Sequence, residues 1–100
     1  MNWYVYIVKC KDNSLYTGIT TNIKRRISEH NAKVGAKSLR GKVPVHLVYK
    51  EIFINQILAA KREREIKGWT RIKKINLIES VKSYLNNNFE GFTLNEVKGR

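Results

Sequence analysis

Apolar and aromatic residues form short runs near the N-terminus. Residues Trp3 to Val8 have the sequence WYVYIV, rich in aromatic and β-branched side chains and short for a helix, so they predict a buried strand. Leu15 to Ile19 predict a second strand. The residues between the two runs, with Asp12 and Asn13 at the tip, have turn chemistry. Because the connection is short, we expect the two strands to form a hairpin.

The next segment changes to helical spacing. Thr20, Thr21 and Asn22 offer side chains that cap helices. The helix is expected to begin near Ile23 and to end before Gly35. Residues 33–44 then form a basic loop with two glycines and a proline. This loop is either a flexible flap that contacts phosphates or a solvated connector.

The second half of the chain predicts one more strand and two more helices. Val45 to Phe53 alternate partly between apolar and polar side chains, which favours a third strand. Asn55 would cap a helix that Gly68 ends or kinks. Residues 70–85 predict a further helix, whose apolar side, with Ile75, Ile78, Val81 and Leu85, we expect to pack on the sheet.

The element order of strand, strand, helix, strand, helix, helix indicates an α+β fold with a small sheet covered by helices. One hundred residues leave little room for a second core. We therefore predict a single domain over residues 1–85 and a polar C-terminal tail over residues 86–100.

The chain carries a large excess of basic residues. Twenty Lys and Arg residues against eight Asp and Glu residues give a formal net charge of +12, which favours a polyanionic partner such as nucleic acid; the alternative is a basic but inert surface. The single cysteine excludes an internal disulfide and is typical of a reducing compartment. No apolar run approaches the roughly 20 residues that span a membrane. We expect a cytoplasmic soluble protein with no membrane partner.

Two tyrosines, an arginine and a histidine are candidates for one phosphate site. Tyr6 and Tyr16 lie on the two strands of the hairpin. Arg26 and His30 lie one turn apart on the helix that follows, on the side that leans towards the core. The planar guanidinium of Arg26 matches a phosphate. The alternatives are core tyrosines, each satisfied by one hydrogen bond, and a surface pair between Arg26 and Glu29.

Glu63 is the candidate metal ligand. It shares a helix side with Ala59, Ala60 and Ile66, and the small residues would let that helix approach the sheet closely. A carboxylate there suits a hard divalent cation whose other ligands are water and substrate phosphate. The alternative is an ion pair with Lys67 at i+4.

Further cations would contact a nucleic-acid backbone without reading its sequence. The residues that we assign to this role are Lys24, Arg25, Lys37, Arg40, Lys42, Lys67, Lys73 and Lys74.

With these residues in place, the chain resembles the GIY-YIG nuclease superfamily, and most closely its small stand-alone bacterial YhbQ-like group. The resemblance covers about Tyr4 to Leu77. Its motifs are YVY at 4–6, YTG at 16–18, Arg26 and His30 in TTNIKRRISEH, and Glu63 in AAKREREIKGW. Tyr4 stands where the first triad usually has Gly, and Thr17 replaces the Ile of the second.

The resemblance implies a small three-stranded antiparallel sheet flanked by helices. It also implies one-metal hydrolysis of a phosphodiester, with Mg²⁺ or Mn²⁺ as cofactor. Tyr6 would be the general base, and Tyr16 would hold the water or phosphate. Arg26 would stabilise charge on the phosphate, His30 would support the phosphate or the nucleophile, and Glu63 would bind the metal.

Three functions follow as hypotheses. The first is a metal-dependent endonuclease that acts on DNA, with a role in DNA repair or recombination. The second is a nucleic-acid-binding module that keeps the nuclease fold with little or no catalytic activity. The third is an interaction domain that uses its basic surface on other anions. The sequence leaves open whether the substrate is double-stranded, single-stranded, branched or damaged DNA, or RNA.

Overall fold

A computed structural model describes the backbone of residues 1–89 and the side chains of residues 1–81. The chain forms two compact units, residues 1–69 and the residues from Thr70 onward. The single domain proposed for residues 1–85 stays a prediction.

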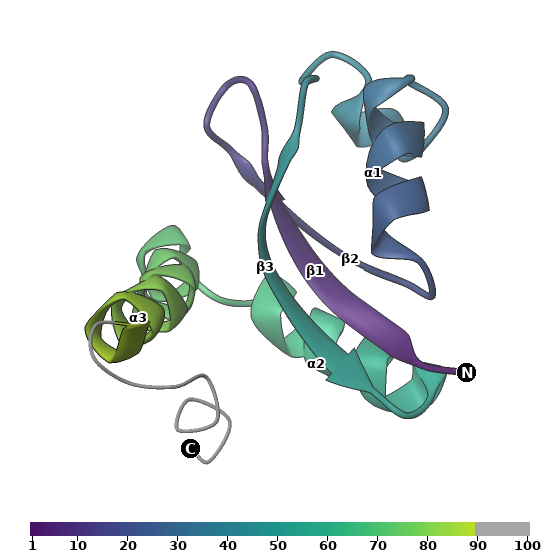
Figure 1. Cartoon of the computed structure of the whole chain (residues 1–100). Coiled ribbons are helices and arrows are strands. Elements are labelled where there is room, and N and C mark those ends of the chain that lie inside the picture. The colour runs from purple at the N-terminus through teal and green to yellow at the C-terminus, as the bar shows by residue number, and fades with distance from the viewer. Residues whose placement is uncertain (90–100) are drawn as a thin grey trace. The chain divides into compact units, whose positions relative to one another are not determined.

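The first unit is built on a three-stranded antiparallel sheet (Figure 1). Its strands are β1 (Trp3–Lys9), β2 (Leu15–Thr20) and β3 (His46–Phe53), in the order β2-β1-β3. β1 is therefore the central strand. The α+β fold with a small antiparallel sheet and flanking helices is confirmed, and strand boundaries differ from the predicted ones by one residue.

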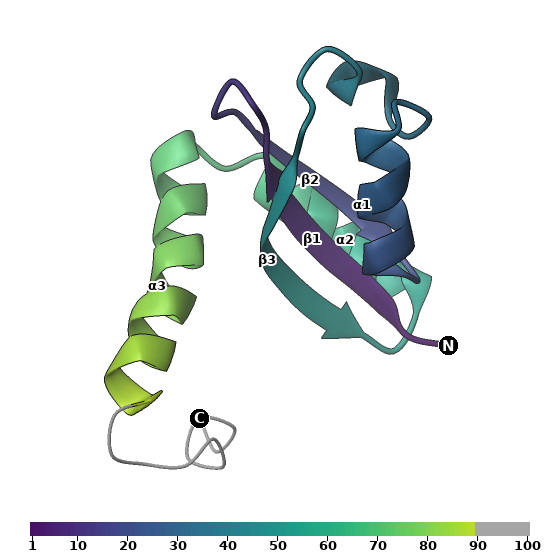
Figure 2. The ribbon, with the colours of Figure 1, turned by 45° about the horizontal axis from the view of Figure 1, so that its top comes forward.

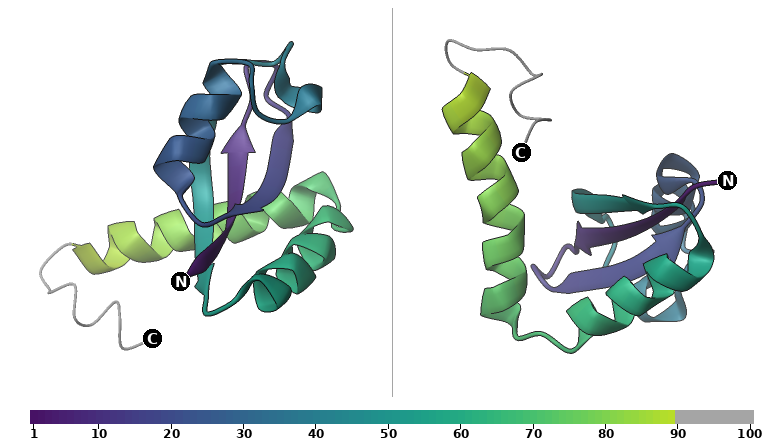
Figure 3. Two further views of the ribbon diagram at one scale, coloured as in Figure 1. Left: turned by 90° about the vertical axis from the view of Figure 1, so that its right-hand side faces the viewer. Right: turned by 90° about the horizontal axis from the view of Figure 1, so that it is seen from below.

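Two helices cover opposite faces of this sheet. Figure 2 shows α1 (Ile23–Asn31) in front of the strands and α2 (Gln56–Lys67) behind them, and the two views of Figure 3 agree. On the α1 side, Tyr6 and Val8 pack in a buried cluster with Cys10, Leu39 and Val45. Val5 and Ile7, which alternate with them along β1, are also fully buried. The sheet is thus a layer between two cores.

Both helices begin at an asparagine. The Asn22 side chain accepts a hydrogen bond from the Arg25 N–H at 3.0 Å, and the Asn55 side chain accepts one from the Leu58 N–H at 2.9 Å. Each cap satisfies a backbone donor that the helix itself leaves unpaired. α1 ends at Asn31, four residues before Gly35.

The loop at residues 33–44 is anchored to the first unit. It contains a short 3₁₀ helix, η1 (Lys37–Leu39), and Leu39 is 3% exposed within the core cluster. The Asn31 side chain pairs with the backbone of Val45, accepting from its N–H at 2.7 Å. An apolar side chain in the middle of the loop therefore packs in the core, and the contact of this loop with phosphates stays a prediction.

The second unit contains α3 (Arg71–Phe89), which extends four residues beyond the predicted end at Leu85. Ile78 is buried, whereas Val81 is 41% exposed. Packing of this helix on the sheet stays a prediction, and so does the tail, most of which lies outside the described residues. Within the described part of the chain, no helix has the length and apolar character needed to cross a membrane.

Candidate active site

Tyr6 lies at the centre of the candidate site. It stands on the middle of β1, is 1% exposed, and pairs in register with Gly18 of β2. A Cβ atom on Gly18 would lie 2.6 Å from the Tyr6 hydroxyl oxygen and 2.8 Å from Cζ. Only glycine leaves space for the phenol there. The close approach expected at Gly18 is therefore that of the protein's own tyrosine, whose ring extends across β2.

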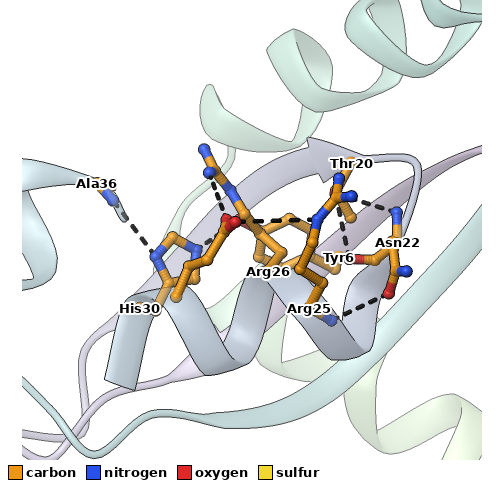
Figure 4. A network of polar contacts seen from close by, with 8 residues as sticks. Tyr6, Thr20, Asn22, Arg25, Arg26, His30 and Ala36 are labelled. Atoms are coloured by element: carbon orange, nitrogen blue, oxygen red, sulfur yellow. Dashed lines mark hydrogen bonds and ion pairs between the residues drawn. The ribbon is translucent and has the colours of Figure 1, made fainter. Parts of the chain in front are cut away.

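The Tyr6 hydroxyl is hydrogen-bonded to His30. Its Oη atom lies 2.8 Å from Nε2 of His30, which is itself 1% exposed (Figure 4). On the other side of the imidazole ring, the backbone N–H of Ala36 donates to Nδ1 at 3.4 Å. The Tyr16 ring packs against both, with its centroid 6.4 Å from that of Tyr6 and 5.6 Å from that of His30. Three of the predicted site residues thus form one buried cluster.

Arg26 lies beside this cluster and forms an ion pair. Its Nη1 donates to Oε1 of Glu29 at 3.1 Å, and its side chain is 37% exposed. The Nε atom of Arg26 is buried and has no hydrogen-bond partner among the described residues. Arg25 is more exposed and lies 3.8 Å from the other oxygen of Glu29. The surface pair considered as an alternative is present, and the guanidinium still has an unused donor.

The groups around Tyr6 have opposing effects on the pKa of its phenol. Burial raises the pKa of the Tyr6 phenol to about 12, and the neighbouring Tyr16 adds to this rise. The positive charge of Arg26 lowers the same pKa, and the negative charge of Glu63 raises it. Burial is the main cause that lowers the pKa of His30, and the positive charge of Arg26 lowers it further. At neutral pH the pair therefore consists of a protonated phenol and a neutral imidazole.

Glu63 lies on α2, which covers the face of the sheet opposite to α1. It lies between Ala59 and Ile66, which are fully buried, so this part of the helix packs closely. Its side chain is 21% exposed and accepts an ion pair from Lys67 Nζ at 3.2 Å. The ion pair with Lys67 that was considered as the alternative is therefore present. The place of Glu63 in the Tyr6 site stays a prediction.

The described residues contain no group of three or more His, Cys, Asp or Glu side chains that could hold a metal ion. One protein carboxylate with water and phosphate oxygens suits Mg²⁺, which keeps several waters and prefers oxygen ligands. The donor set at Glu63 therefore fits a substrate-assisted site for a hard divalent cation.

Four of the predicted backbone-contacting cations lie on the segments that cover the Tyr6 face. These are Lys24 and Arg25 on α1, and Lys37 and Arg40 in and after η1, all exposed. Lys42 is half-buried and lies 3.8 Å from Asp12, and Lys67 is engaged by Glu63. Lys73 and Lys74 belong to the second unit. The first four therefore lie on segments that cover the same face of the sheet as Tyr6.

Arg62 has a structural role that the sequence did not reveal. Its Nε and Nη2 atoms donate to the two oxygens of Glu51 on β3, each at 2.9 Å, and it also pairs with Glu65. Trp69 lies over the guanidinium, with the centroid of its ring at 5.2 Å. Beside it is a hollow of about 270 Å³, lined by Phe53, Leu58, Lys61, Arg62 and Glu65. This network ties α2 to β3 and is separate from the Tyr6 cluster.

Sequence reasoning also missed Gly35 and Ala36. They follow α1 closely and bring the backbone against His30, where a Cβ on Gly35 would collide with Nδ1. The available signal was a glycine shortly after a helix whose last turn carries a candidate histidine, since glycine often marks close backbone approach.

Comparisons with known proteins identify the family of this chain. Residues 2–76 match the family described as the GIY-YIG catalytic domain. A UPF0213 protein of Staphylococcus haemolyticus is 57% identical over 76 residues, which is 76% of this chain and 93% of that protein. A UPF0213 protein of Clostridium perfringens is 54% identical over 87 residues, which is 87% of this chain and 92% of that protein.

Solved structures give the same result. The solution structure of a UPF0213 protein from Bacillus halodurans is 43% identical, with a TM-score of 0.54, and the match covers 93% of this chain and all of that one. That of the protein EF2693 from E. faecalis is 34% identical, with a TM-score of 0.57, over 82% of this chain and 88% of that one. The chain therefore belongs to the GIY-YIG nuclease superfamily, within the small stand-alone group that includes the UPF0213 proteins.

Proposed function

We propose that this protein is a metal-dependent endonuclease that hydrolyses phosphodiester bonds of DNA. The observation that carries the proposal is the polar cluster around one buried phenol: Tyr6 is hydrogen-bonded to His30, and the Tyr16 ring packs against both. Arg26, one helical turn before His30, has a buried Nε without a hydrogen-bond partner among the described residues. A phenol on the central strand of the sheet, buried among polar side chains, has more polar partners than a core tyrosine needs.

Tyr6 would act as general base. The phenolate would take a proton from water while the water oxygen attacks phosphorus, and the bond to the leaving oxygen of the sugar would break. A pKa of about 12 makes the free phenol a poor base at neutral pH. Added positive charge at the site would lower this pKa, because an opposite charge nearby favours the ionised form. His30 would stabilise the phenolate through the hydrogen bond to Oη.

Arg26 would bind the scissile phosphate. Its pair with Glu29 is between partly exposed side chains, and such pairs contribute about 0–1 kcal/mol. A phosphate that reaches the buried Nε and the Nη donors can therefore displace Glu29 at small cost, in the bidentate geometry that guanidinium groups favour. Tyr16, packed against Tyr6 and His30, would hold the water or phosphate against the pair.

Glu63 would hold Mg²⁺ or Mn²⁺. When bound, the ion would supply charge stabilisation at the leaving oxygen. The ion would meet competition from Lys67, whose ammonium group lies against the same carboxylate. Lys24, Arg25, Lys37 and Arg40 would contact the DNA backbone next to the site, with little sequence preference. We propose a cytoplasmic protein that acts in DNA repair or recombination, since such work needs no strong sequence preference.

A cleavage panel tests the proposal. Supercoiled plasmid, branched DNA, single-stranded DNA and RNA are incubated with the protein in Mg²⁺, in Mn²⁺ and in EDTA. Cleavage of DNA that requires the metal, and that Arg26→Ala and Glu63→Gln abolish, is the expected result. No cleavage of any DNA by the wild-type protein under these conditions would contradict the endonuclease function.

One observation favours a second candidate, a binding module without activity. Arg26 and Glu63 are both engaged in ion pairs within the chain, and the Tyr6 phenol is protonated at neutral pH. Salt-dependent DNA binding without cleavage would establish this alternative. Binding that does not change with salt would contradict both functions, because phosphate contacts release counterions.

A further inference from the structure

We propose that the turn at Gly35 and Ala36 is a positioning element that fixes His30 as its Nε2–H tautomer, so that His30 donates its hydrogen bond to Tyr6. The assignment of the tautomer depends on geometry alone. Its catalytic consequence rests on the proposed function, in which Tyr6 is the general base.

The backbone of Ala36 determines where the imidazole proton lies. A backbone N–H can only donate, and the one on Ala36 points at Nδ1 of His30 at 3.4 Å. Nδ1 must therefore be the unprotonated nitrogen of the neutral ring, and the proton must be on Nε2. Nε2 lies 2.8 Å from the Tyr6 hydroxyl, so the imidazole donates there and the phenol oxygen accepts. In neutral histidine, the partner of one nitrogen fixes the state of the other.

Gly35 makes this contact possible. A Cβ atom on Gly35 would collide with Nδ1 of His30 and would lie 3.2 Å from its Cα. The N–H groups of Val34 and Gly35 both donate to the Glu29 carbonyl, at 3.0 and 3.1 Å, and Lys33 takes a positive φ of 66°. The chain thus folds back tightly over the last turn of α1. Any side chain at residue 35 would push this turn off the ring.

The tautomer matters for the Tyr6 phenolate. With Nε2 protonated, the imidazole supplies a donor that favours the ionised phenol. With Nδ1 protonated, Nε2 would present a lone pair, which could only accept the phenol proton and would disfavour the phenolate. The charged and polar groups around the ring are Tyr6 on β1, Tyr16 on β2, and Arg26 and Glu29 on α1. Burial and Arg26 both lower the pKa of His30, which keeps the ring neutral.

Nitrogen-15 NMR of the full-length protein near neutral pH tests the assignment without any variant. The expected spectrum shows Nδ1 of His30 as an unprotonated ring nitrogen and Nε2 as a protonated one, with the exposed His46 as an internal reference. A protonated Nδ1 in the folded wild-type protein would overturn the proposal. This readout is independent of cleavage.

Two variants test the turn. Gly35→Ala is expected to populate the other tautomer and to lower kcat for DNA cleavage by about 10- to 100-fold, the usual effect of losing an outer partner of a site residue, with KM unchanged. Gly41→Ala is the matched control, because a Cβ at Gly41 meets nothing within 4 Å. A Gly35→Ala protein with the wild-type tautomer and kcat would overturn the proposal.

Replacing the Ala36 N–H by an ester oxygen, through incorporation of the α-hydroxy analogue of alanine, covers the case in which Gly35→Ala does not fold. It removes the donor and keeps the space around the ring. The expected result is the same loss of the Nε2–H tautomer, and an unchanged tautomer would refute the role of Ala36. A wild-type protein with the Nε2–H tautomer but no cleavage would support the turn's role and contradict the proposed function.

Discussion

Replacing Tyr6 by Phe removes one oxygen atom from the most central side chain of the site. The ring stays in place, because phenylalanine fills the same volume over Gly18. What disappears is the acceptor for the His30 Nε2–H at 2.8 Å and, in the proposed mechanism, the base itself. The variant therefore separates the chemistry of the hydroxyl from the packing of the ring.

The cost in stability follows from burial. Both partners are 1% exposed, so the His30 N–H would be left without a partner in a site that water does not reach easily. Such a loss costs about 1–3 kcal/mol. For a chain of this size, each kcal/mol shifts Tm by roughly 4–8 °C. Loss of the general base should lower kcat by about 10²- to 10⁴-fold.

Thermal unfolding and single-turnover cleavage measure the two effects separately. Tyr49→Phe is the matched control, since the Tyr49 hydroxyl on β3 also donates to a neighbour, Glu51, and takes no part in the site. We expect it to lose stability and to keep kcat. A Tyr6→Phe protein that cleaves DNA at the wild-type rate would exclude Tyr6 as the base. An unchanged Tm would contradict the buried hydrogen bond.

Three further predictions concern the rest of the site. Gly18→Ala should destabilise the fold by about 1–3 kcal/mol and lower cleavage in parallel, because the new Cβ would lie 2.6 Å from the Tyr6 hydroxyl; wild-type melting and cleavage would refute the close approach. Glu63→Gln should abolish metal-dependent cleavage and leave DNA affinity in EDTA unchanged. Lys67→Gln should lower the Mg²⁺ concentration needed for half-maximal cleavage. A metal titration that neither variant changes would contradict a metal site at Glu63. The pKa of His30 is lowered in the folded state, so the unfolded chain binds more protons below about pH 6.5. The free energy of unfolding should therefore fall as the pH drops below about 6.5. Denaturation curves from pH 7 to 5 should show this pH dependence in the wild-type protein and lack it in His30→Gln.

Local patterns were sufficient to predict the frame of the first unit. The aromatic and β-branched run at Trp3–Val8 predicted β1, and asparagines at 22 and 55 marked the helix starts that the structure shows. These signals are local, because a strand is indicated by its own residues and a cap by the next turn of helix. The helix spacing of Arg26 and His30 likewise predicted that both would lie on the side of the helix that leans towards the core, and His30 is buried there.

The direct contacts within the site were not predicted. The sequence placed Tyr6 and His30 at one candidate phosphate site, but nothing near His30 indicated that its ring would bond to Tyr6 itself, 24 residues away, or that Ala36 would turn back onto Nδ1. The pairing of Arg62 with Glu51 has the same cause: the sequence shows a block of cations, and only the packing of α2 on β3 selects the one that becomes structural.

Comparison of Arg26 and Arg62 shows why an ion pair does not exclude a role in binding. Arg62 holds Glu51 with two donors at 2.9 Å, both side chains are only about a quarter exposed, and a ring covers the guanidinium. Breaking such a pair would leave a poorly solvated carboxylate on β3. Arg26 holds Glu29 with one donor, both side chains are more than a third exposed, and a buried Nε stays unused. Glu29 can become solvated when a phosphate displaces it, whereas Glu51 cannot. Arg26 is therefore suited to binding a phosphate, and Arg62 is suited to holding α2 against β3.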